Sequence, residues 1–353
     1  MRFPVLATPL RLALITPHYF PALRGNSITV ERIATGLSDR GATVKVVPLD
    51  RMTPHEILAD LRVFRPELVH GFHATASGPL TLEVGRALGI PTMVSLTGTD
   101  VNQDLDDAGR GPLVRGVLEE ARAIVVFHEV IRLRVASRLP AAAPKLHVIG
   151  QAVRCREGEF DLRDRLALGP EAFVFLQAAG IRRVKNIPSV IPALTTLQAR
   201  HPHLRYVLAG PILEPEEGAR VQEILRPLPW AVFLGAVTHQ ELCAILASVD
   251  AAINSSLSEG GMSNAVLEAM SRGIPVLATD IEGNRSVVAD GEDGFLFASE
   301  AEFLDKAERL IQDPALRARL GRQARRKIDA RYPPEAEIDG YLQLYRSLLL
   351  GEC

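Results

Sequence analysis

Short runs of continuous apolar and β-branched residues alternate with amphipathic stretches along the whole sequence. In the first half the runs are RLALITP, ATVKVVPL, ELVHGFH, PTMVSLTG, AIVVFHE and KLHVIGQ, and in the second half they are AFVFLQAAG, RYVLAGP, AVFLGAV, DAAINSS, PVLATDI and GFLF. Continuous hydrophobicity is typical of strands that are buried on both faces, and strands separated by helical patterns form right-handed βαβ units. Each half is therefore predicted to be an α/β domain with a doubly wound parallel sheet.

The length of 353 residues exceeds what one core usually supports, so two domains are expected. We predict an N-terminal domain over 1–160 and a second domain over 161–332, facing each other across a cleft. A C-terminal helix over 333–353 could pack back on the N-terminal domain. The charge-rich segment 155–172 is expected to be the linker between the domains.

The formal net charge of −2 gives no global electrostatic reason to bind nucleic acid. No apolar run approaches the roughly 20 residues of a membrane span. Pro4, Pro9 and Arg11 interrupt the opening apolar stretch, which is predicted to be a short tail and not a signal peptide. The basic stretch 317–331 is expected to form a solvated helix face, with at most weak peripheral contact with anionic lipid. A cytoplasmic location follows as the prediction.

The three cysteines, Cys155, Cys243 and Cys353, lie far apart and match no metal or redox spacing, so they are expected to be reduced. No cluster of histidine, cysteine and carboxylate side chains has the spacing of metal ligands. The stretch DLDD (104–107) contains an Asp-x-Asp pattern but falls within a polar helical segment. We therefore expect no metal and no other cofactor.

The stretch LSEGGMSNAVLEAM follows an apolar strand, where open α/β sheets bind ligands. Gly260 and Gly261 would let the backbone approach a ligand, and the following helix would offer N–H groups and a positive dipole end to a diphosphate. Glu268, inside the helix, could accept hydrogen bonds from two ribose hydroxyls, and Glu259 could face a sugar ring. The alternative is a tight turn with two solvated acids.

A second stretch of this half, GIRRVKN (180–186), follows the strand AFVFLQAA directly. Arg182 and Lys185 would supply the positive charge that phosphates require, with Lys185 at the rim of the cleft. By itself the stretch could be a solvated basic turn. Because both stretches follow strands of the same half, together they favour a diphosphate site.

The first half carries weaker signals at its strand ends. Gly25 and Asn26 form a tight loop before a helix, without the Gly-x-Gly-x-x-Gly spacing of a dinucleotide site. His70 and His73 end a strand, and the sequence leaves open whether they pack or act, and which of them faces the cleft. Asp100 ends the next strand, where it could meet a hydroxyl group or cap a helix.

Four stretches, SEGGMSNAVLEAM, RGIPVLATDIEGNRSVV, DGEDGFLF and GIRRVKN, together resemble the donor-site signature of family 4 retaining glycosyltransferases. That family has the GT-B fold of two Rossmann-like domains. With GNSIT and LTGTDVNQD, the sequence looks most like the glycosyltransferase-1-domain-containing protein group. It is more distantly similar to selenosugar synthases.

The resemblance implies transfer of a sugar from a nucleotide sugar, expected to be a UDP-sugar, to an unidentified acceptor. Retention of configuration and independence of metal are part of this expectation. The implied donor-binding residues are Gly25, Asn26, Arg182, Lys185, Gly260, Gly261, Met262, Ser263, Asn264 and Glu268. The implied catalytic residues are His70 or His73 near the anomeric carbon, Asp100 on the acceptor side and Glu259 beside the donor sugar.

The chain departs from the family pattern at one point. The family usually spaces its two acids eight residues apart, whereas Glu259 and Glu268 are nine apart. Either the loop accommodates an extra glycine, or Gly260 occupies the place of the first acid. Three alternative functions stay open: a selenosugar or thiosugar synthase using a UDP-sugar, a nucleotide-sugar epimerase, and a non-catalytic nucleotide-sugar-binding protein.

Overall fold

A computed structural model describes residues 9–20, 25–155 and 158–352. The chain divides into two compact units, Met1–Ala152 with Pro334–Cys353 and Val153–Pro333. The predicted N-terminal tail up to residue 8 and the third cysteine, Cys353, lie outside the described residues.

The first unit is built on a six-stranded parallel sheet with the order β2-β1-β3-β4-β5-β6. Its strands are β1 (Arg11–Thr16), β2 (Thr43–Pro48), β3 (Leu68–Phe72), β4 (Thr92–Ser95), β5 (Ala123–Val126) and β6 (Leu146–Val148). Its α-helices are α1 (Gly25–Asp39), α2 (Pro54–Phe64), α3 (Gly78–Leu88), α4 (Thr99–Asn102), α5 (Gly111–Glu120), α6 (Glu129–Arg138) and α15 (Pro334–Leu350).

Helices cover both faces of this sheet, which explains the continuous apolar runs. Along β1, Leu12 and Leu14 point into a core shared with α1 and α15. Ala13 and Ile15 point to the other face, where they pack with α2 and α3. Because side chains alternate across a strand, a strand with two buried faces must be apolar at every position.

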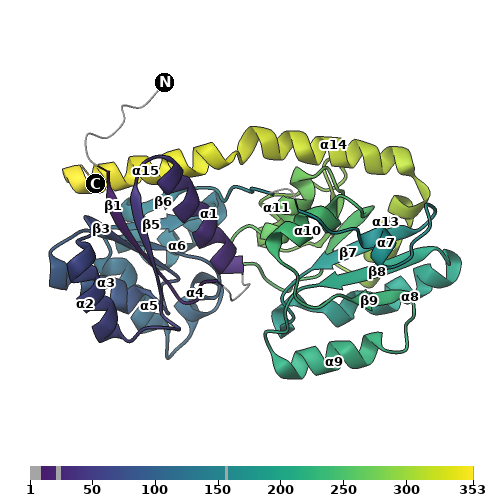
Figure 1. Cartoon of the computed structure of the whole chain (residues 1–353), viewed down its shortest axis with the longest axis horizontal. Coiled ribbons are helices and arrows are strands. Elements are labelled where there is room, and N and C mark those ends of the chain that lie inside the picture. The colour runs from purple at the N-terminus through teal and green to yellow at the C-terminus, as the bar shows by residue number, and fades with distance from the viewer. Residues whose placement is uncertain (1–8, 21–24, 156–157, 353) are drawn as a thin grey trace. The chain divides into compact units, whose positions relative to one another are not determined.

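Helix α15 belongs to the first unit although about 180 residues separate it from the preceding part of that unit. It lies beside α1 (Figure 1). Arg32 of α1 donates two hydrogen bonds to the carboxylate of Glu337, at 2.7 and 2.9 Å, and both side chains are buried. Tyr341 and Tyr345 are fully buried in the same core.

The second unit has its own six-stranded parallel sheet, with the order β12-β11-β10-β7-β8-β9. Its strands are β7 (Phe173–Ala178), β8 (Leu204–Ala209), β9 (Ala231–Phe233), β10 (Ala251–Asn254), β11 (Val276–Thr279) and β12 (Phe295–Phe297). Its α-helices are α7 (Leu162–Arg165), α8 (Ile191–Arg200), α9 (Pro215–Leu225), α10 (His239–Leu246), α11 (Asn264–Ser271), α12 (Glu282–Arg285), α13 (Glu300–Gln312) and α14 (Pro314–Arg331).

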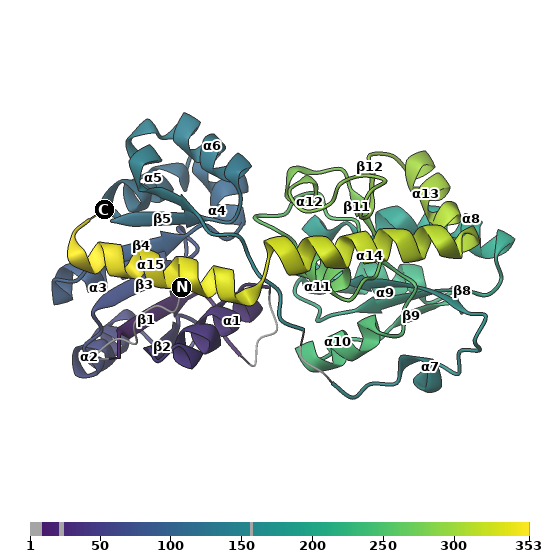
Figure 2. The same cartoon turned by 90° about the horizontal axis from the view of Figure 1, so that it is seen from above.

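This sheet is also buried on both faces. Helices α8, α9 and α13 pack on one face, and α10, α11 and α14 pack on the other. Figure 2 shows α14 lying along α11. The stretch 317–331 is helical, as predicted, and Arg319, Arg322 and Arg326 are exposed on it. Contact of this helix with anionic lipid stays a prediction.

The segment predicted to be a linker, 155–172, instead packs on the second unit in its described part. Leu162 is fully buried in the core beneath α10 and α11. The guanidinium of Arg163 donates to Asp250 and to the backbone carbonyls of Ser248, Gly169 and Ala172. The charge of this segment thus satisfies backbone groups, which is why its composition resembled that of a solvated linker.

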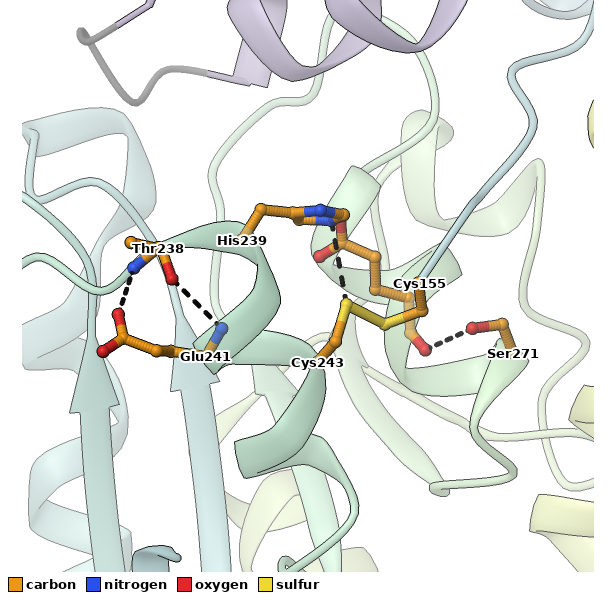
Figure 3. The surroundings of a disulfide bond; sticks show 7 residues. Cys155, Thr238, His239, Glu241, Cys243 and Ser271 are labelled. Carbon is orange, nitrogen blue, oxygen red and sulfur yellow. Dashed lines mark hydrogen bonds and ion pairs between the residues drawn. A yellow bond between two sulfur atoms is a disulfide. The ribbon is translucent and has the colours of Figure 1, made fainter. Parts of the chain in front are cut away.

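The expectation of reduced cysteines is wrong for two of the three. A disulfide joins Cys155 to Cys243 of α10 (Figure 3). Disulfides are rare in the reducing cytosol, so this bond gives no support to the predicted cytoplasmic location. That location stays a prediction. None of the helices in the described part of the chain combines the length and apolar character that a membrane span requires.

Loss of this disulfide should lower the stability of the second unit. The bond closes a loop over a sequence separation of 88 residues, so its removal frees the unfolded chain and should cost about 2–4 kcal/mol. We expect Cys155→Ala, at a half-buried position, to lower the urea midpoint by a corresponding amount. Reductant should have the same effect on the unchanged protein and none on the variant. An unchanged protein that is insensitive to reductant would contradict this expectation.

Candidate functional site

Each sheet has one position where neighbouring strands lead to opposite sides. In the second unit, β7 leads through α8 to β8, whereas its neighbour β10 leads through α11 to β11 on the other side. In the first unit, β1 and β3 stand in the same relation. Ligands of open α/β sheets bind at the carboxyl ends of strands at such switch points.

The two motifs of the second half meet at the switch point between β7 and β10. The turn Arg183–Lys185 follows β7, and the loop 255–263 follows β10. The backbone N–H of Leu257 donates to the carbonyl of Val184 at 2.9 Å. The hydroxyl of Ser255 donates to the carbonyl of Lys185 at 2.8 Å. The sheet topology thus brings together segments that are about 70 residues apart in the sequence.

A buried ion pair lies at the centre of this contact. The ammonium of Lys185 is 2.6 Å from Oε1 of Glu259, and the two side chains are only 14% and 11% exposed. Ser256 and Asn254 donate to the same oxygen at 2.7 and 3.1 Å. The side chain of Lys185 is thus largely buried within the second unit, whereas its position at the rim of a cleft stays a prediction.

The environment of Glu259 keeps its carboxylate charged. Burial raises its pKa, but the positive charge of Lys185 and the hydrogen bonds from Lys185, Ser256 and Asn254 outweigh burial. The net result is a pKa below the usual carboxyl range. The acid that the nine-residue spacing left in question thus lies in contact with the predicted phosphate-binding lysine.

Arg182 adds a second cationic group at this position. It precedes the Arg183–Lys185 turn and is half-buried. Its Nε atom is buried and has no hydrogen-bond partner among the described residues. Buried donors are almost always paired in native structures, so this nitrogen is suited to an anionic ligand.

The glycine turn before α11 is tightly packed. A Cβ atom at Gly283 of α12 would lie 2.6 Å from Cβ of Glu259 and 2.7 Å from the carbonyl oxygen of Gly261. Ser263 precedes α11, and its hydroxyl accepts a hydrogen bond from Asn254 at 3.0 Å. Of the predicted ligands in this turn, Gly261, Met262 and Ser263 are buried. Gly260 and Asn264 are partly exposed.

Glu268 lies on α11 in a different contact from Glu259. It is 3% exposed, and Oε1 is 2.9 Å from Nε2 of His239, the first residue of α10. Nothing in the sequence analysis pointed to His239. The pattern Thr238-x-x-Glu241 does mark a helix start, and this signal would have placed the histidine at the beginning of a helix.

In the first unit, His73 follows β3 at the switch point with β1. Its backbone has a φ of +80°, which is unusual for a residue other than glycine and is often found at functional sites. Its Nε2 atom is 2.7 Å from the hydroxyl of Thr99. Both side chains are at least partly exposed, so His73 is the histidine of the predicted pair that can reach a ligand.

His70 is fully buried, and both ring nitrogens are engaged. Nδ1 is 2.8 Å from the hydroxyl of Tyr345, and Nε2 is 2.8 Å from the hydroxyl of Ser95. Burial lowers its pKa to about 3, so the ring is neutral at ordinary pH. This side chain therefore anchors α15 to the sheet, and the structure does not bring it together with His73.

Asp100 is also fully buried, although the family resemblance implied a role on the acceptor side. Its carboxylate accepts hydrogen bonds from the backbone N–H groups of Ala74, Thr97, Gly98 and Val101. These bonds hold the loop after β3 against the loop after β4. Within the described chain these hydrogen bonds to Asp100 all come from backbone N–H groups, and they support the loop that carries His73.

Gly25 and Asn26 were predicted to form a tight loop before a helix, but they are the first two residues of helix α1 itself. The amide of Asn26 donates to the hydroxyl of Thr16 at 3.0 Å. Its Oδ1 atom is buried and has no hydrogen-bond partner within the described chain. A polar atom of Asn26 is thus available at the switch point between β1 and β3.

The Asp-x-Asp pattern at 104–107 is occupied by protein contacts. Asp104 is buried and accepts hydrogen bonds from Thr75 at 2.6 Å and Arg110 at 2.8 Å. Asp106 pairs with Arg138. Among the described residues, no group of three or more histidine, cysteine and acidic side chains is arranged to hold a metal ion.

Comparison with known proteins gives the relationships of the chain. Residues 159–327 match the family model described as Glycosyl transferases group 1. Glycosyltransferase 1 domain-containing protein 1 of Xenopus tropicalis is 29% identical over 336 residues, which cover 92% of this chain and 94% of that protein. D-inositol 3-phosphate glycosyltransferase of Arthrobacter sp. (strain FB24) is 27% identical, over 76% of this chain and 70% of that protein.

Solved structures share the fold. Sucrose-phosphate synthase from Thermosynechococcus elongatus matches with a TM-score of 0.83 and 19% identity, over 97% of this chain and all (100%) of that chain. Anabaena Alr3699/HepE in complex with UDP-glucose matches with a TM-score of 0.79 and 15% identity, over 96% of this chain and 100% of that one. The predicted GT-B fold is therefore confirmed.

Removing the positive charge of Lys185 should destabilise the second unit. Lys185→Met would leave Glu259 buried without its cation, at a cost of about 3–5 kcal/mol in unfolding free energy. The double variant Lys185→Met with Glu259→Gln should recover most of this loss. Because the pKa of Glu259 is lowered on folding, the pair stabilises above the ordinary carboxyl pKa, and this contribution disappears as the pH falls through the lowered value. Urea unfolding at pH 7 would contradict this reading if Lys185→Met behaved like the unchanged protein.

His70 should contribute a pH dependence to stability. When unfolded, its ring binds a proton near its ordinary pKa of about 6.5, whereas the buried ring does not until about pH 3. The contribution is therefore fully present above the unfolded pKa and is lost at about 1.4 kcal/mol per pH unit below it. Between pH 6 and 4.5, we expect the His70→Gln variant to bind about one proton fewer on unfolding than the unchanged protein does. Equal uptake by both proteins would show that His70 is accessible.

Proposed function

We propose that this chain, whose residues 159–327 match the family model described as Glycosyl transferases group 1, transfers a sugar from a UDP-sugar to an acceptor. The observation that carries the proposal is the meeting of the Arg183–Lys185 turn with the glycine turn at the β7–β10 switch point. A cationic turn beside a helix N-terminus is the arrangement that a diphosphate requires. In a GT-B fold this unit would then hold the donor.

The donor would be bound by groups that the structure has already ordered. The guanidinium of Arg182, with its unpaired Nε, and the ammonium of Lys185 would bind the diphosphate. Lys185 has three hydrogens, so it can bind phosphate oxygen while keeping its contact with Glu259. The N–H groups at the start of α11 would add donors to the phosphates. Glu268 would accept hydrogen bonds from the ribose hydroxyls.

The choice of UDP rests on the neighbours. Anabaena Alr3699/HepE was solved with UDP-glucose and with UDP, and the pneumococcal O-GlcNAc transferase GtfA with UDP and GlcNAc. Because these matches are only 15% identical, they support uracil as the base of the donor only as a proposal. The sugar and the acceptor are not specified by them.

The chemistry would be mainly electrostatic. When the bond between the anomeric carbon and the diphosphate breaks, negative charge grows on the leaving oxygen. Arg182, Lys185 and the dipole of α11 would stabilise that charge, so we propose that no metal is required. Glu259, kept anionic by Lys185, would face the sugar ring, where positive charge develops.

Retention of configuration is proposed from the resemblance to family 4. In that family retention is usually attributed to front-face attack, in which the acceptor approaches the anomeric carbon on the same face from which the leaving group departs. No nucleophilic residue is therefore assigned. We propose that the first unit binds the acceptor through the loops at its own switch point. His73 and Asn26 are the candidates there, and Asp100 would act by holding the His73 loop.

Donor binding can be tested without knowing the acceptor. UDP should raise the melting temperature with or without EDTA, because a ligand that binds only the folded state stabilises it by mass action, by about 2.7 kcal/mol at 100 times Kd. Glu268→Gln should weaken this effect at least several-fold, while Glu292→Gln, an exposed acid of the same unit, should not. Stabilisation that requires Mn²⁺ or Mg²⁺ would contradict the metal-free site. Binding of UDP-glucose without any hydrolysis or transfer would favour a non-catalytic binding protein.

A further inference from the structure

The carboxylate of Glu268 is held in place by a side chain from a neighbouring helix. Nε2 of His239 lies 2.9 Å from Oε1 of Glu268, and the two side chains are 20% and 4% exposed. An ionised carboxylate can only accept hydrogen bonds, so Nε2 carries the hydrogen and donates it. Within the described chain, the contact of this carboxylate with His239 is made through Oε1 and not through Oε2.

The start of α10 fixes His239 in this position. Thr238 and Glu241 form a capping box, in which the Thr238 hydroxyl accepts from the N–H of Glu241 at 3.2 Å and Glu241 accepts from the N–H of Thr238 at 2.7 Å (Figure 3). This box makes His239 the first residue of the helix. The backbone from which its ring projects is therefore fixed beside α11.

The disulfide restrains the same helix one turn further on. Cys243 is fully buried, and its sulfur lies 3.9 Å from Nε2 of His239. The bond to Cys155 ties this turn of α10 to the segment that enters the second unit. Figure 3 shows the imidazole lying over the disulfide. The ring of His239 thus has the sulfur on one side and the carboxylate of Glu268 on another.

We infer that His239 is a positioning residue for nucleotide recognition. It holds Oε1 of Glu268 so that Oε2 is presented to the ribose hydroxyls of the donor. The terminal torsion of a glutamate is broad, so a carboxylate without this bond would rotate and lose orientation. The inference rests on the proposed function, since it assigns His239 to the ribose end of that site.

A purely structural role would make a different prediction. If the pair only fastened α10 to α11, its loss would weaken binding of every nucleotide equally, through the stability of the unit. If His239 orients Glu268, its loss should weaken only those nucleotides that carry ribose hydroxyls. The preference for UDP over 2′,3′-dideoxy-UDP therefore separates the two roles.

Calorimetry with both nucleotides on the full-length protein would measure this preference. We expect the unchanged protein to bind UDP at least tenfold more tightly than 2′,3′-dideoxy-UDP. His239→Leu should lose most of this preference, with the affinity for dideoxy-UDP nearly unchanged. His239→Gln should retain it, because the amide nitrogen of glutamine can take the place of Nε2, whereas His239→Asn should behave like leucine because its side chain is shorter.

A matched control is available in the same unit. His201 forms a similar pair with Glu308, with Nε2 3.3 Å from Oε1, so His201→Leu removes a histidine–glutamate contact at another position. This variant should keep the full preference for UDP. Thermal unfolding of each variant would establish that it is folded at the temperature of the measurement.

The outcomes distinguish the inference from the proposed function. Loss of the preference in Glu268→Gln but not in His239→Leu would overturn the inference and leave the ribose role of Glu268 intact. Equal loss of affinity for both nucleotides in His239→Leu would also overturn it. If Glu268→Gln itself kept the preference, the proposed ribose contact would fail, and the inference with it. If His239→Leu does not fold, His239→Gln and His239→Asn test the inference in its place. Equal preferences of these two variants for UDP over 2′,3′-dideoxy-UDP would reject it.

Discussion

Burial of both faces of each parallel sheet is the constraint on which the rest of this structure depends. It requires apolar side chains at successive strand positions, so polar groups are concentrated where the strands end. In parallel strands those carboxyl ends share one edge, and the change of direction between β7 and β10 separates their helices there. The Arg183–Lys185 turn and the loop 255–263 meet at this place because both follow strands of the same sheet.

Two contacts between an acid and a basic side chain order this edge, and they differ in kind. Lys185 and Glu259 form a buried pair of opposite charges, which is costly to desolvate and is stabilised by the hydrogen bonds of Ser256 and Asn254. Glu268 instead receives a hydrogen bond from a histidine, which keeps its orientation without requiring a full positive charge. The first contact sets the electrostatics proposed for phosphate, and the second sets the direction of a carboxylate.

All twelve predicted strands appear in the described chain, because double burial leaves a signal at each strand position. The two doubly wound sheets, and the segments that meet at the β7–β10 switch point, were predictable for the same reason, whereas the GT-B fold was expected from the resemblance to family 4 glycosyltransferases. The pairings were not predictable. Nothing in the stretch around Lys185 shows that it pairs with Glu259, and the Cys155–Cys243 bond spans 88 residues. The role of His239 depends on how α10 packs against α11, which has no signature in either helix alone.

The placement of α15 has a consequence for synthesis on the ribosome. The second unit is one continuous segment, whereas the first needs residues 334–350 to bury β1, β3 and the ring of His70. While the chain emerges in order, the second unit can complete its core as soon as residue 333 is available. The first unit must wait with an apolar sheet face uncovered, and domains in that condition are prone to aggregate. The order of synthesis therefore favours completion of the core of the second unit before that of the first.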